Sequence, residues 1–293
     1  MKIGIVQMAS TNDPWANLLS FSAFLKEAKY FQVQLLCFPE NVFYRGPFNF
    51  KSPQEWPIAF DFKRDADVEN SAKNLFRTSE QMAFQDEVEN LLIEFDLNVA
   101  IGSCWEVSGR SDRYFNAQAM WVNGQWHSIY RKIHLFRYCS ERISYDERAQ
   151  VTAGDTVVST DVEGVRVGSS ICYDLRFPEL YRQLVLDQSC ELLLVPAAFT
   201  KSTGERHWLK LLCARAIENQ AYVLAPAQWG EHKNESQQSC SCYGHSAVVD
   251  PDGSMLWCAA GIGDDLGFVD LNLPLLKQIR KQIPVLSDSI LRL

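Results

Sequence analysis

The sequence has no long apolar segment and no tract of unusual composition. There is no run of about twenty consecutive apolar residues, and the stretch 1–8 turns polar too soon for a secretory signal peptide. No proline-, glycine- and serine-rich linker, low-complexity tract or block of like charge divides the chain. We therefore expect a soluble protein of the cytoplasm, with no membrane partner, that forms a single domain over residues 1–293.

Basic residues and disulfide spacings are also scarce. The chain has 28 lysines and arginines against 36 acidic residues, and its formal net charge is -8. A nucleic-acid surface needs clustered Lys and Arg to replace counterions, so nucleic acid is not an expected partner. The nine cysteines are an odd number and lie in apolar segments such as 36–38 and 212–214. This distribution favours reduced core thiols over a disulfide framework, and it favours small molecules or proteins as partners.

The composition is that of an ordinary globular protein, with 47% hydrophobic and 22% charged residues in a chain of 293. Residues 2–8 alternate as a strand, and 14–30 have helical spacing after the capping residue Asp13. Asn123-Gly124 predicts a tight hairpin over 114–131. Helices are also predicted over 78–95, 178–187 and 205–219, a loop over 137–154, and strands over 35–38, 98–101, 192–195, 222–225, 246–249, 254–258, 267–270 and around 157 and 165. This alternation fits one doubly wound sheet or two stacked sheets equally well.

Three predicted strands end in a chemically useful side chain. Cys172 follows the run 165–171, Glu40 follows 34–38, and Lys132 follows the alternating stretch 125–131. The amides of a turn after a strand favour the thiolate form of a cysteine. Together the three residues supply a nucleophile, a proton acceptor and a cation for an oxyanion, as acyl transfer from an amide requires. Taken singly, each also fits a structural role, as an apolar core residue or a solvated strand end.

The order Glu, Lys, Cys and the motifs around these residues resemble the nitrilase superfamily of carbon-nitrogen hydrolases. The resemblance continues through 196–200, 203–204, 207–208, 214–220, 243–246 and 250–253. It implies an α/β fold, a four-layer αββα sandwich of two stacked mixed β-sheets with helices outside. It also implies a homodimer or higher homo-oligomer, formed through helices that flank the nucleophile segment, and a reaction that uses no metal or organic cofactor.

The resemblance implies a role for each residue of the site. Glu40 accepts the proton of the Cys172 thiol, and the thiolate attacks the amide carbon to give a thioester. Lys132 and the backbone N–H of Tyr173 hold the oxyanion. We expect the nearby cation to lower the pKa of the thiol, and burial to shift the pKa of every charged group in the site.

The family has a second glutamate in the loop after the lysine, which would hold Lys132 and orient the substrate. Alignment through residues 152–155 assigns this role to Glu147. Glu141 is the competing candidate, because the segment 137–142 departs from the glycine-rich loop that is usual in the family. Alternatively, Glu147 is a surface-loop residue with no role in the site.

Within the superfamily, the segment 172–182 and the C-terminal motifs are most similar to the deaminated-glutathione amidase branch, with the ω-amidases as close relatives. The first group releases 2-oxoglutarate and cysteinylglycine, and the second releases ammonia from 2-oxoglutaramate. Either substrate, a small-molecule amide, has a carboxylate that a guanidinium binds bidentately. Arg176, supported by the hydroxyl of Thr200, is the candidate; alternatively, Arg176 pairs with Asp174 or Glu179.

The segment 44–78 is more aromatic than is typical of the family, and we expect it to line the pocket mouth or to pack between subunits. Its aromatic residues include Phe48, Phe50, Trp56, Phe60 and Phe62. Either position would alter the substrate preference.

Three other interpretations stay open. A zinc site would use two histidines and two cysteines of one polar loop, although their Cys-x-Cys spacing is not the usual Cys-x-x-Cys. These four residues are His232, Cys240, Cys242 and His245. A papain-like hydrolase would need a histidine base, for which His134, His207 and His245 lack the matching context. A non-catalytic interaction module would not need the three strand-end residues.

Overall fold

The structure is a computed structural model that describes residues 1–46, 50, 53–62, 77–108, 113–139, 144–233 and 239–290. The first sheet consists of β1 (Lys2–Met8), β2 (Leu35–Cys37), β3 (Val99–Val107), β4 (Tyr114–Val122), β5 (Gln125–Arg131), β12 (Ala227–Lys233), β13 (Ser239–Tyr243) and β16 (Asp265–Asp270). The second consists of β8 (Ser159–Val162), β9 (Val165–Ser169), β10 (Leu192–Leu194), β11 (Tyr222–Ala225), β14 (Ala247–Val249) and β15 (Met255–Cys258). The helices are α1 (Pro14–Tyr30), α2 (Ser79–Phe95), α3 (Pro178–Leu186), α4 (Lys201–Asn219) and α5 (Leu273–Gln282).

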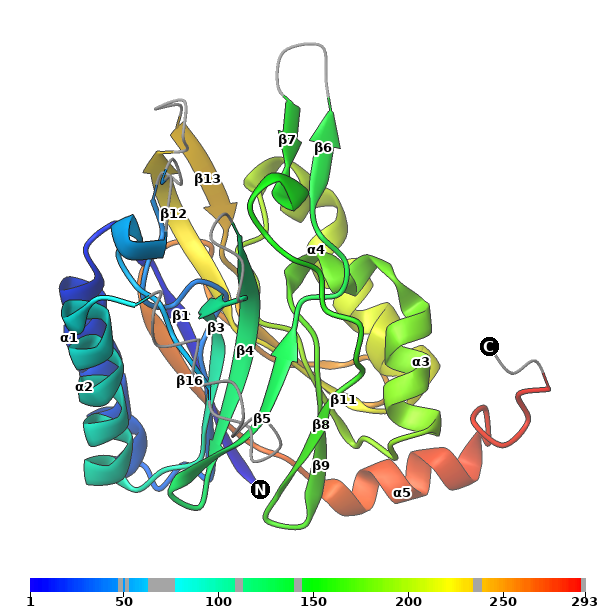
Figure 1. Cartoon of the computed structure of the whole chain (residues 1–293). Helices are drawn as coiled ribbons and strands as arrows, with labels where there is room; N and C mark the ends of the chain where they lie inside the picture. The colour runs from blue at the N-terminus through cyan, green and yellow to red at the C-terminus, as the bar shows by residue number, and fades with distance from the viewer. Residues whose placement is uncertain are drawn as a thin grey trace.

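The two sheets lie face to face, and helices cover both outer faces (Figure 1). The first has the order β13-β12-β1-β2-β3-β4-β5, with β16 also paired to β1, and the second has the order β15-β14-β11-β10-β9-β8. Helices α1 and α2 pack on the first sheet, and α3 and α4 on the second (Figure 1). The four-layer αββα sandwich is therefore confirmed, and the alternative of one doubly wound sheet is wrong.

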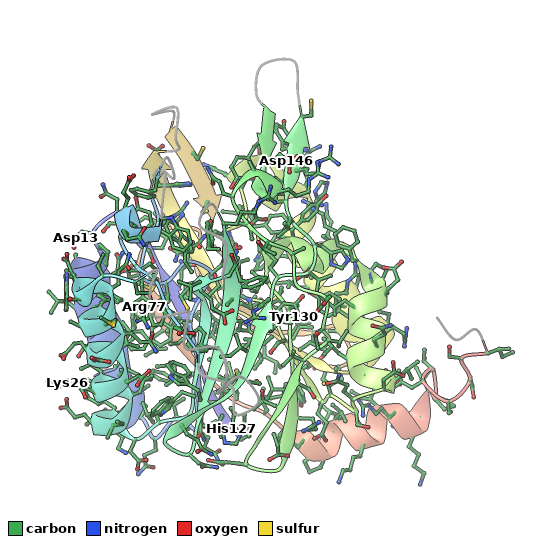
Figure 2. The ribbon with its side chains drawn as sticks, in the orientation of Figure 1. Asp13, Lys26, Arg77, His127, Tyr130 and Asp146 are labelled. Atoms are coloured by element: carbon green, nitrogen blue, oxygen red, sulfur yellow. The ribbon has the colours of Figure 1, made fainter. Side chains whose placement is uncertain are left out.

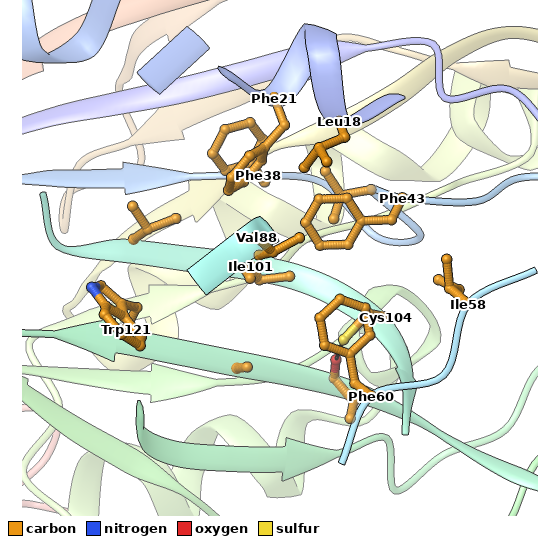
Figure 3. Close-up of a cluster of buried hydrophobic side chains, with 14 of the residues drawn as sticks. Leu18, Phe21, Phe38, Phe43, Ile58, Phe60, Val88, Ile101, Cys104 and Trp121 are labelled. Carbon is orange, nitrogen blue, oxygen red and sulfur yellow. Dashed lines mark hydrogen bonds between the residues drawn. The ribbon is translucent and has the colours of Figure 1, made fainter. Parts of the chain in front are cut away.

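The period of two along each strand divides the apolar side chains between separate cores. Ile3 and Ile5 of β1 lie in the core between the sheets, whereas Val6 lies in the core under α1 and α2. Figure 3 shows this outer core, where Phe21 of α1 and Val88 of α2 meet side chains from the first sheet. Strands such as β2 are buried on both faces, which explains why 35–38 is wholly apolar.

The helix starts follow the capping residues in the sequence. Asp13 accepts hydrogen bonds from the backbone N–H groups of Trp15 and Ala16 at 3.0 and 3.1 Å, at the start of α1. Thr78 and Gln81 form a reciprocal capping box at the start of α2. Figure 2 shows Asp13 at one end of α1 and Lys26 on its outer side. Among the residues described, no helix is long and apolar enough to cross a membrane.

Three features differ from the sequence prediction. The expected loop 137–154 contains a projecting hairpin, β6 (Arg137–Cys139) and β7 (Ser144–Asp146), followed by the short turn η3 (Glu147–Ala149) (Figure 1). Strands β12 and β13 were missed because their sequences are largely polar, and helix α5 was not predicted either.

Helix α4 begins four residues earlier than predicted. Gly204 obscured its start, because glycine is a poor helix former; here it allows close approach of Tyr243, whose Cβ would lie 2.5 Å from an added Cβ.

The direction of the strands brings their ends to one edge of the molecule. Strands β2 and β3 are parallel, and two antiparallel steps through β4 make β5 parallel to both. In the second sheet β9, β10 and β11 are parallel. Gln118 of β4 links the sheets here, because its side chain donates a hydrogen bond to the carbonyl of Ser170 at 3.2 Å. The chain segments that follow β2, β5 and β9 therefore meet.

The core between the sheets gives a test of the sandwich. Leu194 of β10 is fully buried there, so Leu194→Ala removes contacts with both sheets and leaves a cavity. We expect it to lower the free energy of unfolding by about 2 to 5 kcal/mol, measured by equilibrium urea denaturation. The matched control is Leu19→Ala on α1, where the side chain is 75% exposed. Equal effects of the two substitutions would contradict the assigned core.

Candidate active site

The three strand-end residues of the sequence prediction come together in the structure. Glu40 follows β2, Lys132 follows β5, and Cys172 opens the short turn η4 (Cys172–Arg176) after β9. The ammonium Nζ of Lys132 lies 3.0 Å from Oε1 of Glu40. The Glu40 carboxylate also interacts with the Cys172 thiol, and this interaction shifts the pKa values of both groups. The carboxylate therefore connects the amine with the sulfur.

Glu147 is a second carboxylate on the same ammonium. Its Oε2 lies 3.0 Å from Nζ of Lys132, and the backbone N–H of Phe136 donates to that oxygen at 2.7 Å. The turn η3, which sequence reasoning treated as loop, delivers this side chain to the interior. Glu141, the competing candidate, lies outside the described residues.

Asn116 of β4 completes the polar cluster, and the sequence prediction missed it. Its side-chain amide donates to Oε1 of Glu40 at 2.9 Å and to Oε1 of Glu147 at 3.4 Å. Its backbone carbonyl accepts from the N–H of Lys132 at 2.9 Å. The only signal in the sequence was an amide among the inward-facing residues of a strongly apolar strand. Asn116 fixes the positions of both carboxylates.

Burial and charge together set the pKa values of the cluster. Burial raises the pKa of Glu40, but the Lys132 ammonium and hydrogen bonds from Lys132, Cys172 and the Ala198 backbone outweigh it, so the pKa is lowered. The pKa of Glu147 is raised by burial and by the neighbouring Glu40 charge, against the effect of Lys132. The pKa of Lys132 is raised well above its usual range: burial alone would lower it, but both carboxylates stabilise the ammonium. Glu40 is therefore the ionised partner of the ammonium.

The thiol differs from the expectation. Burial and the negative charge of Glu40 raise the pKa of Cys172 well above its usual range, and the Lys132 ammonium only partly offsets them. The cation therefore lowers the pKa of the thiol as expected, but burial and the Glu40 charge outweigh it, and the net shift is upward. The resting site holds a neutral thiol beside a carboxylate that is able to accept its proton.

The backbone at Cys172 is held in an uncommon conformation. Its φ is 47°, in the left-handed region that non-glycine residues seldom adopt. The N–H of Cys172 donates to the carbonyl of Pro196 at 2.9 Å, so it is not available to a ligand. No acceptor among the described residues takes the N–H of Tyr173, the next donor in the turn. This N–H is therefore available to bind an oxyanion.

Asp174 anchors the nucleophile turn to the end of β5, and sequence reasoning assigned it no such role. It is fully buried, and its carboxylate accepts from the Tyr130 hydroxyl at 2.7 Å and from the Ile171 N–H at 2.9 Å. It also accepts from the N–H of His134 at 2.9 Å. Figure 2 shows Tyr130 in the interior of the molecule. These bonds tie the residues on either side of Lys132 to the turn that presents Cys172.

Arg176 ends the turn that Cys172 opens, and Thr200 lies two residues after Ala198, whose N–H binds Glu40. The Arg176 guanidinium lies 5.0 Å from the ring centre of Phe199, and its Nη1 lies 3.3 Å from Nδ1 of His207. Among the described residues Arg176 forms no ion pair with Asp174 or Glu179. The hydroxyl of Thr200 forms a 2.8 Å hydrogen bond with that of Thr203, at the start of α4.

The alternative interpretations are not favoured by the geometry. No group of three or more His, Cys, Asp or Glu side chains in the described part of the chain is arranged to hold a metal. Instead, the Arg45 guanidinium contacts both His232 and Cys242, and His245 stacks on Tyr243. Of the candidate papain-like bases, His134 is bonded to Asp174, and His207 and His245 have the partners already named.

The aromatic residues of the segment 44–78 are also placed differently from the expectation. Trp56, Phe60 and Phe62 are buried in the outer core under α2, and Phe50 packs against that core. Phe48 lies outside the described residues. Trp56, Phe60 and Phe62 therefore pack within the chain.

The chain is similar to proteins of known family and known structure. The sequence matches the family described as carbon-nitrogen hydrolase over residues 2–281. It is 34% identical to the deaminated glutathione amidase of Dictyostelium discoideum over 292 residues, 98% of this chain and 93% of that protein. It is 39% identical to the omega-amidase NIT2 of Mus musculus over 163 residues, 55% of this chain and 56% of that protein.

Two solved structures have the same fold. The NitFhit protein of C. elegans matches with a TM-score of 0.80 and 28% identity, over 99% of this chain and 65% of that longer chain. Nit3 of Saccharomyces cerevisiae, described as a member of branch 10 of the nitrilase superfamily, matches with a TM-score of 0.75 and 26% identity, over 97% of this chain and 94% of that one. The chain thus belongs to the carbon-nitrogen hydrolase family of the nitrilase superfamily and is a hydrolase of carbon-nitrogen bonds other than peptide bonds.

Proposed function

We propose that the protein is a cysteine-dependent amidase that hydrolyses deaminated glutathione to 2-oxoglutarate and cysteinylglycine through a thioester. The observation that carries the chemistry is the position of one buried carboxylate, Glu40, which lies 3.0 Å from the Lys132 ammonium and raises the pKa of the Cys172 thiol. The choice of substrate is supported by the similarity to the Dictyostelium discoideum deaminated glutathione amidase along nearly the whole chain.

In the first half of the reaction Glu40 takes the thiol proton as Cys172 attacks the amide carbon. The lowered pKa of Glu40 keeps it ionised, and the raised pKa of the thiol keeps the proton on sulfur until a substrate arrives. The Lys132 ammonium and the Tyr173 N–H then stabilise the tetrahedral oxyanion. The proton passes from Glu40 to the leaving amine, the carbon-nitrogen bond breaks, and a thioester remains on Cys172.

In the second half Glu40 accepts a proton from water, and the resulting hydroxide attacks the thioester carbon. Collapse of the second tetrahedral intermediate releases the acid, and Glu40 returns the proton to the Cys172 sulfur. Glu147 and Asn116 do not exchange protons in this scheme. They hold Lys132 and Glu40 in place and share the charge of the ammonium.

Arg176 is the proposed partner of the substrate carboxylate next to the 2-oxo group. Its guanidinium has an imidazole and two aromatic rings as neighbours, and no acidic side chain is paired with it among the described residues. Burial, together with the positive charges of Arg176, Arg206 and Lys210, lowers the pKa of His207, so the imidazole beside the guanidinium stays neutral. Thr200 contributes a hydroxyl at the same end of α4.

Two further functions are alternatives. Hydrolysis of 2-oxoglutaramate, as in an ω-amidase, uses the same site and is favoured by the similarity to the mouse omega-amidase. A non-catalytic interaction module would need none of the buried charges of the site. The homo-oligomer and the cytoplasmic location stay predictions.

The thioester scheme predicts that Cys172→Ala and Cys172→Ser lower kcat/KM for deaminated glutathione by at least about 10³-fold. The reason is that no other group takes over the attack on carbon. Product release is measured by chromatography, and circular dichroism verifies the fold. The matched control is Cys258→Ser, which changes an exposed cysteine and leaves activity unchanged. Turnover by well-folded Cys172→Ala would refute the scheme.

The origin of the raised thiol pKa predicts how alkylation depends on pH. Glu40→Gln removes a negative charge and an acceptor that both raise the pKa of Cys172, so the midpoint of iodoacetamide alkylation moves to lower pH. Mass spectrometry of the peptide that contains Cys172 separates its reaction from that of the other cysteines. Glu205→Gln, on the exposed face of α4, is the charge control and leaves the midpoint in place. An unchanged or higher midpoint in Glu40→Gln contradicts the assigned contact.

The carboxylate role of Arg176 predicts that Arg176→Met raises KM for deaminated glutathione and 2-oxoglutaramate about 10- to 100-fold, with a smaller change in kcat. The interaction is made equally in the ground state and the transition state, which is why KM takes most of the effect. Steady-state kinetics with both substrates provide the test, and Lys210→Met, on the exposed side of α4, is the control. A fall in kcat at constant KM would argue for a different role.

A further inference from the structure

A second arginine near the site is buried without an acidic partner. Arg45 is 5% exposed, and its Nη1 donates to the carbonyl of Trp229 at 3.2 Å. Its Nη2 donates to Sγ of Cys242 at 2.7 Å and also contacts Nδ1 of His232. No acidic side chain within the described residues forms an ion pair with it. Buried charges in proteins are usually paired, so a guanidinium with this environment is unusual.

The side chains around Arg45 do not compensate its charge. Burial and the Arg45 cation lower the pKa of His232 to about 4, so the imidazole is neutral at pH 7. Burial raises the pKa of Cys242 to about 11, although Arg45 opposes this, and the thiol is neutral as well. The positive charge therefore remains available to an anion that enters from outside the chain.

Arg45 lies close to the reacting groups through the segment 198–200. The N–H of Ala198 donates to Oε2 of Glu40 at 2.8 Å, and two residues later Thr200 is paired in a β-bridge with Cys242, the partner of Arg45. The Glu40 charge contributes to the raised pKa of Cys242, which again puts the two groups near each other. The His232 side of the cluster is partly exposed, so Arg45 lies next to a side chain that solvent reaches.

Two guanidinium groups thus border the segment that holds the catalytic carboxylate. Arg176 packs on the ring of Phe199. Arg45 donates a hydrogen bond to Cys242, which forms the β-bridge with Thr200. An amide with an anionic group on each side of the scissile bond fits this arrangement better than an amide with only one.

We propose that Arg45 is a specificity-determining residue that binds a carboxylate on the leaving amine of the substrate. The inference rests on the proposed function and deepens it: Arg176 binds the acyl side, and Arg45 the amine side. The leaving group of deaminated glutathione, cysteinylglycine, has such a carboxylate, whereas ammonia, the leaving group of 2-oxoglutaramate, has none. Arg45 therefore selects amides of carboxylated amines over primary amides.

The experiment compares three substrates with the full-length protein: deaminated glutathione, its analogue with a C-terminal carboxamide, and 2-oxoglutaramate. For the wild type we expect kcat/KM to be about tenfold or more higher for deaminated glutathione than for its carboxamide, the size of a charge-assisted hydrogen bond. Arg45→Met loses about the same factor on deaminated glutathione and changes less than about twofold on the other two. Arg45→Lys keeps the charge and recovers part of the loss.

The control is Arg206→Met, which removes an exposed positive charge from α4 and affects the three substrates alike. Equal losses on all three substrates in Arg45→Met would mean a structural role and would overturn the proposal. Equal wild-type rates on the acid and the carboxamide would overturn it even if Arg45→Met does not fold. Absence of wild-type turnover on all three would instead refute the proposed function, an outcome distinct from turnover without carboxylate selectivity.

Discussion

The ion cluster of Glu40, Lys132 and Glu147 is the constraint on which the rest of the site depends. One ammonium and two carboxylates are removed from water, and each alone would be strongly destabilised in the interior. The cluster is stable because the Lys132 ammonium lies 3.0 Å from a Glu40 oxygen and 3.1 Å from a Glu147 oxygen. Asn116 donates a further hydrogen bond to Glu40. Any chain movement that separates them leaves an unpaired buried charge. The chain segments that follow β2 and β5 must therefore stay in fixed positions relative to each other.

The sandwich meets this requirement by joining the sheets near the site. The side chains of Gln118 and Tyr130, both in the first sheet, donate hydrogen bonds to the Ser170 carbonyl and the Asp174 carboxylate, which lie close to Cys172 in the sequence. Asp174 accepts several of these bonds, and it keeps the nucleophile turn against the end of β5. The left-handed backbone of Cys172 is tolerated because these bonds fix the residues on both sides of it. The rigidity of the two-sheet core is thus used directly at the point where chemistry takes place.

The protonation states follow from the same arrangement and not from the residue types alone. A cysteine near a lysine suggests a thiolate, yet burial, together with the carboxylate that binds the ammonium, raises the pKa of the thiol. In the proposed scheme Glu40 is the base that must be charged before substrate binds, and its lowered pKa suits that role. Arg45 and Arg176 differ from the central ammonium in having no carboxylate partner among the described residues.

Sequence patterns determined the strand-end positions of Glu40, Lys132 and Cys172, the caps of α1 and α2 and the hairpin at Asn123-Gly124, because these are local properties of the chain. Short polar strands such as β12 lack a local signal, and their pairing with distant strands decides their structure. The contributions of Asn116 and Asp174, and the reversal of the thiol pKa, were decided only by the tertiary structure. Each depends on groups that are far apart in the sequence and meet only when the two sheets pack.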